Sequence, residues 1–349
     1  MSNVPPPRTF RIHLLPMLGV LFLGILLVAA FAGWQLDYFK AKPKVAIVTW
    51  NQDPYWDVVL EGAQAAANAR NLDLTIVRSE PGVKAQAQHV QDLVNQGIQG
   101  IAISPNGPSE QLSYLNDVAG KIILVTIDSD AQVPKRRAFV GTDNYAAGQL
   151  CGEQIRNALP DGGDIIISVG SIDMANGRDR RQGIIDNLLD RRPDKSRPTD
   201  PLDAPLKGAH YAVDATVLDS GDPAKAIAGV ADAIKAHPDV KCIVGLFSYS
   251  PAAVARAIDQ AGKTGKIKAV GFDESDATQA GVADGSIYCS IIQDQYNCGY
   301  NSIDYIAQII NWPDENAPGG VRYFPLYIRV MKPDNIADLR SSRIIHTPR

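Results

Sequence analysis

The sequence predicts an α/β fold with two lobes, each built on a parallel sheet, preceded by one N-terminal transmembrane helix. Three observations support this prediction. Short apolar strands alternate with amphipathic helices along the chain, which is the pattern of βαβ units. The chain has 349 residues, more than one typical domain, and 45% of them are hydrophobic, which is enough for two cores. A long apolar run precedes the first strand.

The N-terminus has the features of a targeting segment. Arg8 and Arg11 precede an almost uninterrupted apolar run at residues 14–34, about 20 residues, which as a helix would cross the hydrocarbon core once. Basic residues before the run favour a cytoplasmic start and an exported remainder. We favour an uncleaved anchor in the inner membrane, because Trp34 suits a membrane interface. The alternative is a signal peptide cleaved near Ala32, which would release the protein into the periplasm.

The first lobe begins at a strand over residues 45–48, whose apolar run has no polar alternation, as in a strand buried on both faces. Further strands are predicted at 74–77, 100–104 and 121–127, and helices at 58–70, 83–96 and 108–118. Polar residues follow three of these strands, at 49, 104–106 and 128–130. Because the carboxyl ends of parallel strands meet at one edge of a sheet, we expect a ligand site there.

A second set of strands and helices repeats this plan. Strands are predicted at 138–141, 164–169, 211–218, 242–246, 268–272 and 287–292, and helices at 144–159, 178–189, 223–236 and 251–260. Residues 190–207 are rich in Pro, Asp and Arg and are predicted to be a surface insertion. The tail at 333–349 is expected to be poorly ordered or loosely docked.

The loop after the first strand carries Asp53, Tyr55 and Trp56. Two aromatic side chains beside a carboxylate suit a small polar ligand with an apolar face. The alternative is that Tyr55 and Trp56 only fill the gap between strand and helix.

Seven motifs then occur in an order and at separations that resemble a known family. They are DPYW at 53–56, TIDSD at 126–130, GTDN at 141–144, GRDRRQG at 177–183, HPDVKCIVG at 237–245, VGFDES at 270–275 and SIIQD at 290–294. The chain from 44 to 332 thereby resembles the type I periplasmic sugar-binding proteins, in particular the ribose-binding kind. The resemblance implies two Rossmann-like lobes joined by three hinge strands, which close on a sugar and deliver it to an ABC transporter permease.

The same resemblance implies the boundaries of the parts. Residues 1–43 are the anchor and linker, 44–142 with 294–323 the first lobe, 143–293 with 324–332 the second lobe, and 333–349 the tail. The three crossings between lobes are expected near residues 142–143, 293–294 and 323–324.

The resemblance also implies the ligand contacts. In the first lobe these are Thr49, Asp53, Tyr55, Trp56, Ser104 and Asp128, and in the second lobe Arg180, Phe247, Ser248, Phe272, Asp273 and Gln293. Carboxylates would accept hydrogen bonds from sugar hydroxyls, and the Arg180 guanidinium would donate hydrogen bonds to them. By local sequence alone, Arg180 belongs to a charge run typical of a solvated helix face, and Asp128 and Asp273 suit helix caps.

Four positions depart from the family pattern. Ser129 stands where the family often has Arg, Phe247 and Ser248 stand where it often has Asn and Asp, and Gly221 stands where it has an aromatic or polar contact. These departures argue against ribose itself and leave a monosaccharide or related polyol as the expected ligand.

Other classes of function lack their motifs. The net charge of −4 and dispersed basic residues argue against nucleic-acid binding, and the apolar N-terminus replaces the helix-turn-helix of lactose-type repressors. The five His are scattered without metal-ligand spacing, so no metal site is predicted. The sequence has no glycine-rich loop of the kind that binds a dinucleotide, so no cofactor is predicted. The sequence shows no constellation of a nucleophile with a general base, so an enzyme is not predicted. The four Cys are interpreted as mostly buried, with a disulfide among the last three as an alternative.

The predicted function is that of an exported, membrane-anchored, monomeric solute-binding protein. It would capture a monosaccharide or related polyol in the cleft between the lobes for an ABC permease. The alternative is a ligand-sensing module that docks on a membrane sensor kinase or chemoreceptor.

Overall fold

The computed structural model describes residues 22–29, 31, 41–80, 82–313 and 320–342. The chain divides into two compact units, Met1–Lys42 and Pro43–Arg349. In the first unit, residues 22–29 are helical and carry exposed apolar side chains. The predicted membrane span at 14–34 falls mostly outside the described residues. Over the residues that are described, no helix is both long enough and apolar enough to cross a membrane.

The first lobe is built on a six-stranded parallel sheet in the order β12-β5-β4-β3-β1-β2. Its strands are β1 (Lys44–Val48), β2 (Asp73–Val77), β3 (Gly100–Ile103), β4 (Ile123–Ile127), β5 (Ala138–Thr142) and β12 (Arg322–Leu326). Strand β1, which lies between β3 and β2, is buried at four of its five positions, which explains its lack of polar alternation.

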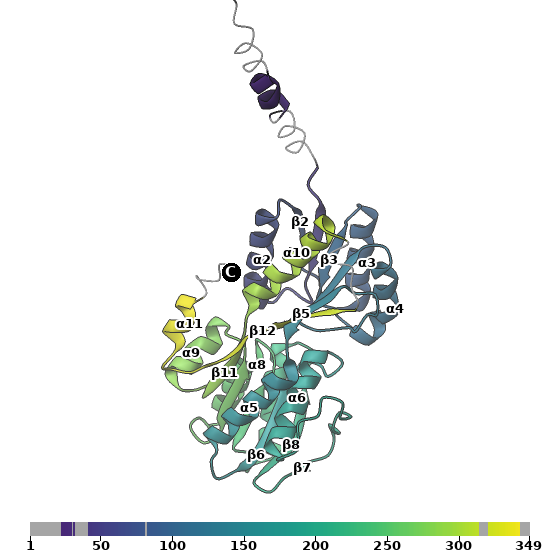
Figure 1. Ribbon diagram of the computed structural model, residues 1–349. Coiled ribbons are helices and arrows are strands. Elements are labelled where there is room, and N and C mark those ends of the chain that lie inside the picture. Colours follow the sequence, from purple (N-terminus) through teal and green to yellow (C-terminus); the bar gives the residue numbers. More distant parts are fainter. Residues whose placement is uncertain (1–21, 30, 32–40, 81, 314–319, 343–349) are drawn as a thin grey trace, which may run out of the picture. The chain divides into compact units, whose positions relative to one another are not determined.

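Helices cover both faces of this sheet (Figure 1). They are α2 (Tyr55–Ala69) and α10 (Gln295–Asn311) on one face, and α3 (Val83–Asn95) and α4 (Pro108–Ala119) on the other. Helices α2 and α10 approach closely because glycine lies at their contact. A Cβ on Gly62 would stand 2.0 Å from the Tyr296 carbonyl oxygen, and one on Gly299 would stand 1.8 Å from the Val59 oxygen.

The second lobe has a seven-stranded sheet in the order β13-β11-β10-β9-β6-β8-β7, antiparallel only at its two edges. Its strands are β6 (Gly163–Val169), β7 (Leu206–Lys207), β8 (Tyr211–Leu218), β9 (Cys242–Gly245), β10 (Lys268–Phe272), β11 (Cys289–Gln293) and β13 (Ile328–Met331). Helices α5 (Asn144–Ala158) and α6 (Ala175–Leu188) pack on one face. Helices α7 (Pro223–Ala236), α8 (Ser250–Gln260) and α9 (Asp276–Asp284) pack on the other.

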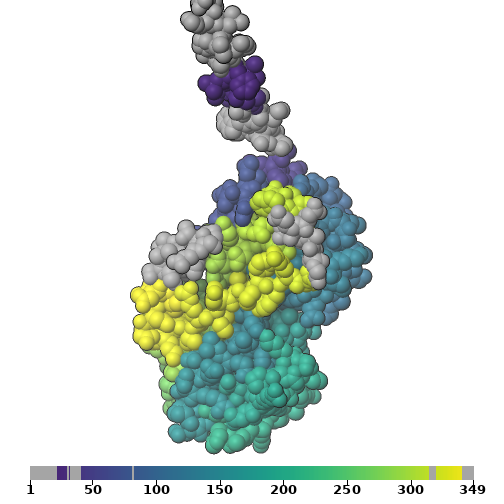
Figure 2. All heavy atoms as spheres, in the orientation of Figure 1, coloured from purple at the N-terminus to yellow at the C-terminus, as the bar shows by residue number. Residues whose placement is uncertain are grey.

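The chain crosses between the lobes three times. After β5 and after β11, an aspartate ends the strand and caps the next helix: the Asp143 carboxylate accepts from the Ala146 amide at 3.1 Å, and Asp294 from the Asn297 amide at 3.2 Å. The third crossing was expected near 323–324. It lies at Tyr327, because β12 stays paired with β5 through Leu326. In Figure 2 the yellow atoms, which include those of β12 and β13, run across the region where the two lobes meet.

The tail differs from its expectation. Residues 336–342 form α11 (Ile336–Ser342), and the Ile336 side chain is buried in the core of the second lobe. The helices α9 and α10 and the strands β12 and β13 were also absent from the sequence prediction. The first turn of α10, QYNC, is largely polar on its surface side, so apolar periodicity does not mark the start of the helix.

The insertion at 190–207 is fastened to its lobe by charge. The carboxylate of Asp186 on α6 is fully buried and lies 3.4 Å from Arg191 Nη1 and 3.3 Å from Arg197 Nε. Arg191 also contacts Asp200 at 2.6 Å. The insertion is therefore ordered around a buried carboxylate, because an unpaired charge there would be costly.

Candidate ligand-binding site

Two aspartates end strands at facing positions in the two lobes. Asp128 follows β4 and Asp273 follows β10, and both adopt the left-handed backbone conformation, with φ of 59° and 65°. Asp is one of the few residues that tolerate this conformation, and such strain is concentrated at functional sites. Neither residue caps a helix; the cap of α9 is Ser275. The helix-cap alternative for both aspartates was therefore wrong.

On the first lobe, Tyr55 and Trp56 lie in the first turn of α2 instead of on a loop, because the Asp53 carboxylate accepts from the Tyr55 amide at 2.7 Å and starts the helix early. The Tyr55 hydroxyl donates to Asp128 Oδ1 at 3.2 Å. The Trp56 ring is only 1% exposed, and its Nε1 donates to Asn51 Oδ1 at 2.9 Å. Trp56 therefore combines the two alternatives, since it fills the core beneath the site and one edge still lines the cavity.

On the second lobe, Arg180 is almost fully buried, at 1% exposure. Its Nε donates to Asn144 Oδ1 at 2.8 Å, and its Nη1 to the Leu246 carbonyl at 2.7 Å. Its guanidinium lies over the Phe272 ring, 4.5 Å from the centroid. Nη2 is buried and has no hydrogen-bond partner among the residues that the structure describes. Arg180 is thus not part of a solvated helix face, and one donor is left for a further acceptor.

Gln293 links the site to a crossing between lobes. Its Nε2 donates to Asp273 Oδ1 at 2.8 Å, and its Oε1 accepts from the Thr142 hydroxyl at 2.7 Å. Thr142 ends β5, immediately before the first crossing. The position of the Asp273 carboxylate is therefore tied to two of the three connections between lobes.

The lobes also contact each other directly at the site. Ser248 Oγ donates to Asp53 Oδ1 at 3.2 Å, and Asn176 Nδ2 donates to Asp128 Oδ2 at 3.2 Å. In both pairs the carboxylate belongs to the first lobe and the donor to the second. The structure is thus a closed arrangement of the two lobes.

Between these groups lies a cavity with about 350 Å³ of space free of protein atoms, part of it open to solvent. Its lining comes from both lobes and consists of Trp50, Asn51, Asp53, Tyr55, Trp56, Asp128, Asn176, Arg180, Phe247, Ser248, Asp273 and Gln293.

Nine of the twelve residues expected to contact a ligand thus lie on one cavity. The other three, Thr49, Ser104 and Phe272, are fully buried behind it. Ser104 Oγ donates to Asp128 at 3.5 Å and Phe272 supports Arg180, so these two act on the lining from behind. Thr49 Oγ1 donates to the Asn51 carbonyl at 2.6 Å.

Trp50 lines the cavity and was not expected to. It packs against the cores of both lobes, with its ring edge-on to Phe247 at 5.8 Å between centroids. Gly221 makes room for it, since a Cβ there would stand 3.1 Å from Trp50 Cη2. The space at Gly221, where the resemblance implied an aromatic or polar contact, is thus filled by an aromatic from the other lobe. Trp50 lies directly after the polar end of the first strand, and this position in the sequence would have indicated it as a lining residue. Asn176 also lines the cavity, but its sequence position offers no comparable signal.

Burial dominates the protonation of both strand-end carboxyls. Burial raises the pKa of Asp128, although Arg180, Tyr55 and Ser104 each act to lower it. Burial also raises the pKa of Asp273 to about 7, opposed by Arg180 and by the hydrogen bond from Gln293. Among described residues, neither carboxylate forms an ion pair with Arg180, so the three groups surround a space.

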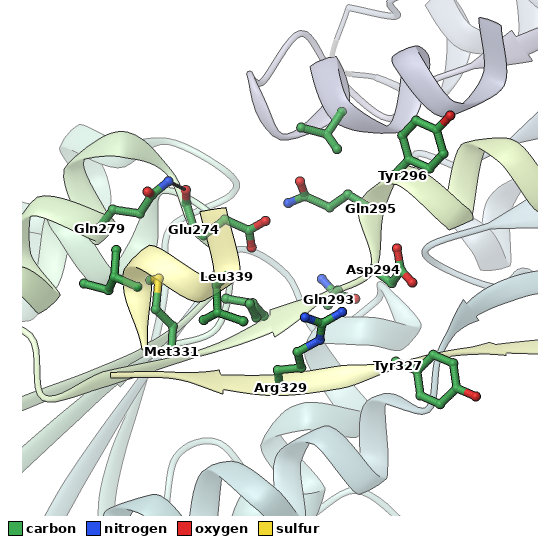
Figure 3. A pocket seen from close by; sticks show the side chains of 13 residues that line it. Glu274, Gln279, Gln293, Asp294, Gln295, Tyr296, Tyr327, Arg329, Met331 and Leu339 are labelled. Carbon is green, nitrogen blue, oxygen red and sulfur yellow. Dashed lines mark hydrogen bonds between the residues drawn. The ribbon is translucent and has the colours of Figure 1, made fainter. Parts of the chain in front are cut away.

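A second cavity lies at the crossings and has about 610 Å³ of free space, part of it open to solvent (Figure 3). Gln293 lines both cavities. Arg329 on β13 and Tyr296 on α10 face this second cavity from different lobes. Within the described part of the chain, no group of His, Cys, Asp or Glu is arranged to hold a metal ion. The four cysteines are buried and free, so the disulfide alternative is wrong.

The chain was compared with known proteins. The model of the family described as periplasmic binding protein domain matches residues 45–313. The chain belongs to this family. As a periplasmic binding protein it is 25% identical to the D-allose-binding periplasmic protein of Escherichia coli, over 75% of this chain and 82% of that one. It is 23% identical to the ribose import binding protein of Salmonella typhimurium, over 77% and 86%.

Solved structures agree on the fold. An ABC transporter solute-binding protein of Burkholderia graminis, in complex with D-arabinose, superposes with a TM-score of 0.76 at 25% identity. The match covers 85% of this chain and 98% of that one. The predicted type I periplasmic binding protein fold is thereby confirmed.

Proposed function

We propose that this protein binds a monosaccharide or a related polyol in the interlobe cavity and delivers it to an ABC transporter permease, without chemical turnover. The observation that carries the proposal is the buried, unpaired Nη2 of Arg180 on the same cavity as the carboxylates of Asp53 and Asp273. A sugar hydroxyl both donates and accepts, so it matches donors and acceptors held in one cavity. The rings of Tyr55 and Phe247 offer stacking surfaces for the apolar face of a sugar.

The two lobes would move as rigid bodies. Their expected bounds are 44–142 with 294–323 and 143–293 with 324–332, except that the third crossing lies at Tyr327. Hinge residues are few and lie at the ends of elements, as Asp143 and Asp294 do. A ligand closes the lobes only if it contacts both, because only differential contacts shift the two populations. Relatives named for allose binding and ribose import support transport of a sugar over sensing.

We further propose that residues 14–34 anchor the protein in the inner membrane with the lobes in the periplasm. The apolar run and its basic flank support this. The test is N-terminal sequencing of the protein from the membrane fraction of its native host. An intact start is expected, and a mature protein that begins at Gly33 would exclude the anchor.

The binding proposal is tested by calorimetry of the full-length protein in mild detergent against pentoses, hexoses and polyols. At least one compound should bind with unit stoichiometry and be recovered unchanged. Binding raises stability by RT ln(1 + [L]/Kd), about 2.7 kcal/mol at a hundredfold excess over Kd, so thermal unfolding provides a second readout. Binding of amino acids or nucleosides in place of every sugar and polyol would refute the proposed ligand class.

A further inference from the structure

The cavity has more negative than positive charge. Its lining includes three carboxylates, Asp53, Asp128 and Asp273, and one cation, Arg180. With all four ionised, the lining has a formal charge of −2. The position next to Asp128, where the family often has a second arginine, is Ser129, which is fully buried. No lining residue supplies the missing positive charge.

The hydrogen bonds leave particular atoms available. Both oxygens of Asp128 accept hydrogen bonds: Oδ1 accepts from Tyr55, and Oδ2 accepts from Asn176 and Ser104. In contrast, the bonds at Asp53 all end on Oδ1, and the bond at Asp273 also ends on Oδ1. Among the described residues, each of these two carboxylates thus has one oxygen without a hydrogen-bond partner. The two carboxylates belong to opposite lobes. Arg180 Nη2 is the matching unpaired donor.

We propose that the ligand is cationic, a protonated amino sugar or amino polyol, whose ammonium group binds Asp273 Oδ2 while a hydroxyl accepts from Arg180 Nη2. This inference rests on the proposed function and names the substrate class for the same cavity. An ammonium offers three donors and no acceptor, which is the complement of an unpaired carboxylate oxygen. A charge-assisted bond of this kind is about twice as strong as a neutral one.

Enclosure strengthens the case for a cation. Asp273 is 3% exposed and Asp128 is 7% exposed in the closed arrangement. Beside a neutral sugar these carboxyls keep the cost of burying negative charge, which is relieved only when Asp273 takes up a proton. A cationic ligand compensates one of these charges at the moment when water is excluded. The raised pKa of Asp273, caused first by burial and increased by Glu274 and Asp128, reflects the same excess of negative charge.

Aromatic rings complete the surroundings. Trp50, Tyr55 and Phe247 line the cavity, and Trp is the ring that binds cations best. Because Gly221 leaves space for it, the Trp50 indole packs against the cores of both lobes. These rings accept both the apolar face of a sugar and its ammonium group.

The test compares matched compounds on the full-length protein by calorimetry near neutral pH. D-glucose, D-galactose and D-mannose are each paired with their 2-amino and 6-amino counterparts and with the corresponding N-acetylated sugars. At least one amino sugar should bind about 10-fold or more tightly than its hydroxyl parent. Acetylation removes the charge and should remove the preference.

Variants then locate the ammonium. Asp273→Asn should reduce the preference for the amino sugar about 10-fold or more, while Asp276→Asn, an exposed carboxylate on the same lobe, should leave it unchanged. Circular dichroism checks that each variant folds. Asp273→Gly, which removes the same carboxylate and suits the left-handed backbone at this position, replaces Asp273→Asn if the latter does not fold. A preference that survives in the folded cavity variant would overturn the proposed ion pair.

The outcomes separate the two proposals. Parent sugars that bind as tightly as their amino counterparts, or more tightly, would overturn the cationic ligand and leave a neutral sugar-binding protein. The absence of binding by all sugars, charged and neutral, would overturn the proposed function together with this inference.

Discussion

At the scale of single residues, Arg180 is both structural and part of the candidate site. Two of its donors hold Asn144 and the Leu246 carbonyl, and the third is unpaired. Truncation to Ala would therefore empty a buried position and confuse binding with folding. A substitution that keeps the charge separates the two roles, because an ammonium is a point charge without the planar fork.

We predict that Arg180→Lys weakens sugar binding about 10- to 100-fold, because lysine cannot hold the structural bonds and the ligand together. The unfolding free energy should fall by about 1–3 kcal/mol, since a buried acceptor is left unsatisfied. Calorimetry and chemical denaturation measure the two effects. Arg178→Lys is the control, as this side chain is 37% exposed and pairs with Asp179. Equal affinities of the two variants would contradict the assigned role of Arg180.

The raised pKa of Asp273 predicts how stability depends on pH. Its carboxyl titrates at about 7 in the folded protein against an ordinary 3.8. Between these values the folded state holds a proton that the unfolded state has lost. This group therefore makes the unfolding free energy fall as pH rises from about 4 to about 7, with no further change above.

The measurement is the difference between wild type and Asp273→Asn in chemical denaturation across this pH range, without ligand. Asn cannot titrate, so the variant should lose this component and its stability relative to wild type should increase as pH rises. Groups that titrate alike in both proteins cancel in this difference. Asp200 is one of them: its pKa is lowered, so its contribution to stability changes with pH in the opposite direction in both proteins. Parallel curves for the two proteins would exclude the titration of Asp273.

At the scale of elements, the last helix is the clearest case of an element fixed by packing. Ile336 on α11 is 8% exposed and lies among core residues of the second lobe. A helix this short gains little from its own hydrogen bonds, so the buried side chain must hold it. In addition, Ile336 and Leu339 line the cavity at the crossings.

We predict that Ile336→Ala lowers the unfolding free energy by about 2 kcal/mol, by loss of buried apolar area and creation of a cavity. Ala337→Ser, on the exposed side of the same helix, should change it by less than about 0.5 kcal/mol. Urea denaturation of both full-length variants followed by circular dichroism provides the comparison. Similar midpoints for the two variants would mean that α11 is not docked as described.

At the scale of the whole molecule, direct contacts between the lobes hold the closed arrangement. Two carboxylates of the first lobe accept from the second lobe, and Trp50 packs on both cores. Such contacts favour closure before a ligand arrives, and a ligand that touches both lobes favours it further. Removal of Trp50 should therefore shift the population toward the open form.

We predict that ligand shortens the distance between spin labels placed at Gln88→Cys on α3 and Lys235→Cys on α7. The four natural cysteines are buried, so labels attach to the introduced sites. Trp50→Ala should broaden the ligand-free distance distribution and raise the ligand concentration needed for closure about 10-fold, in keeping with the loss of a large aromatic contact. Pulsed electron resonance measures the distances. Identical distributions with and without ligand in both proteins would exclude lobe closure.

The sequence alone determined the alternation of strands and helices, and with it the two α/β lobes. Strands such as β8 and β10 and helix α7 have the bounds that apolar periodicity predicts, because buried strands and amphipathic helices are local patterns. Asp128 and Asp273 were expected at the sheet edges for a topological reason, since parallel strands bring their carboxyl ends together.

Only the tertiary structure decided what those residues touch. The burial of Arg180, the packing of Trp50 against Gly221, the hydrogen bond from Asn176 to Asp128 and the third crossing at Tyr327 all depend on partners far apart in the chain. Local periodicity has no information about such partners. The excess negative charge of the cavity is likewise a property of the folded protein, because it appears only when three carboxylates and one arginine from separate elements meet on one cavity.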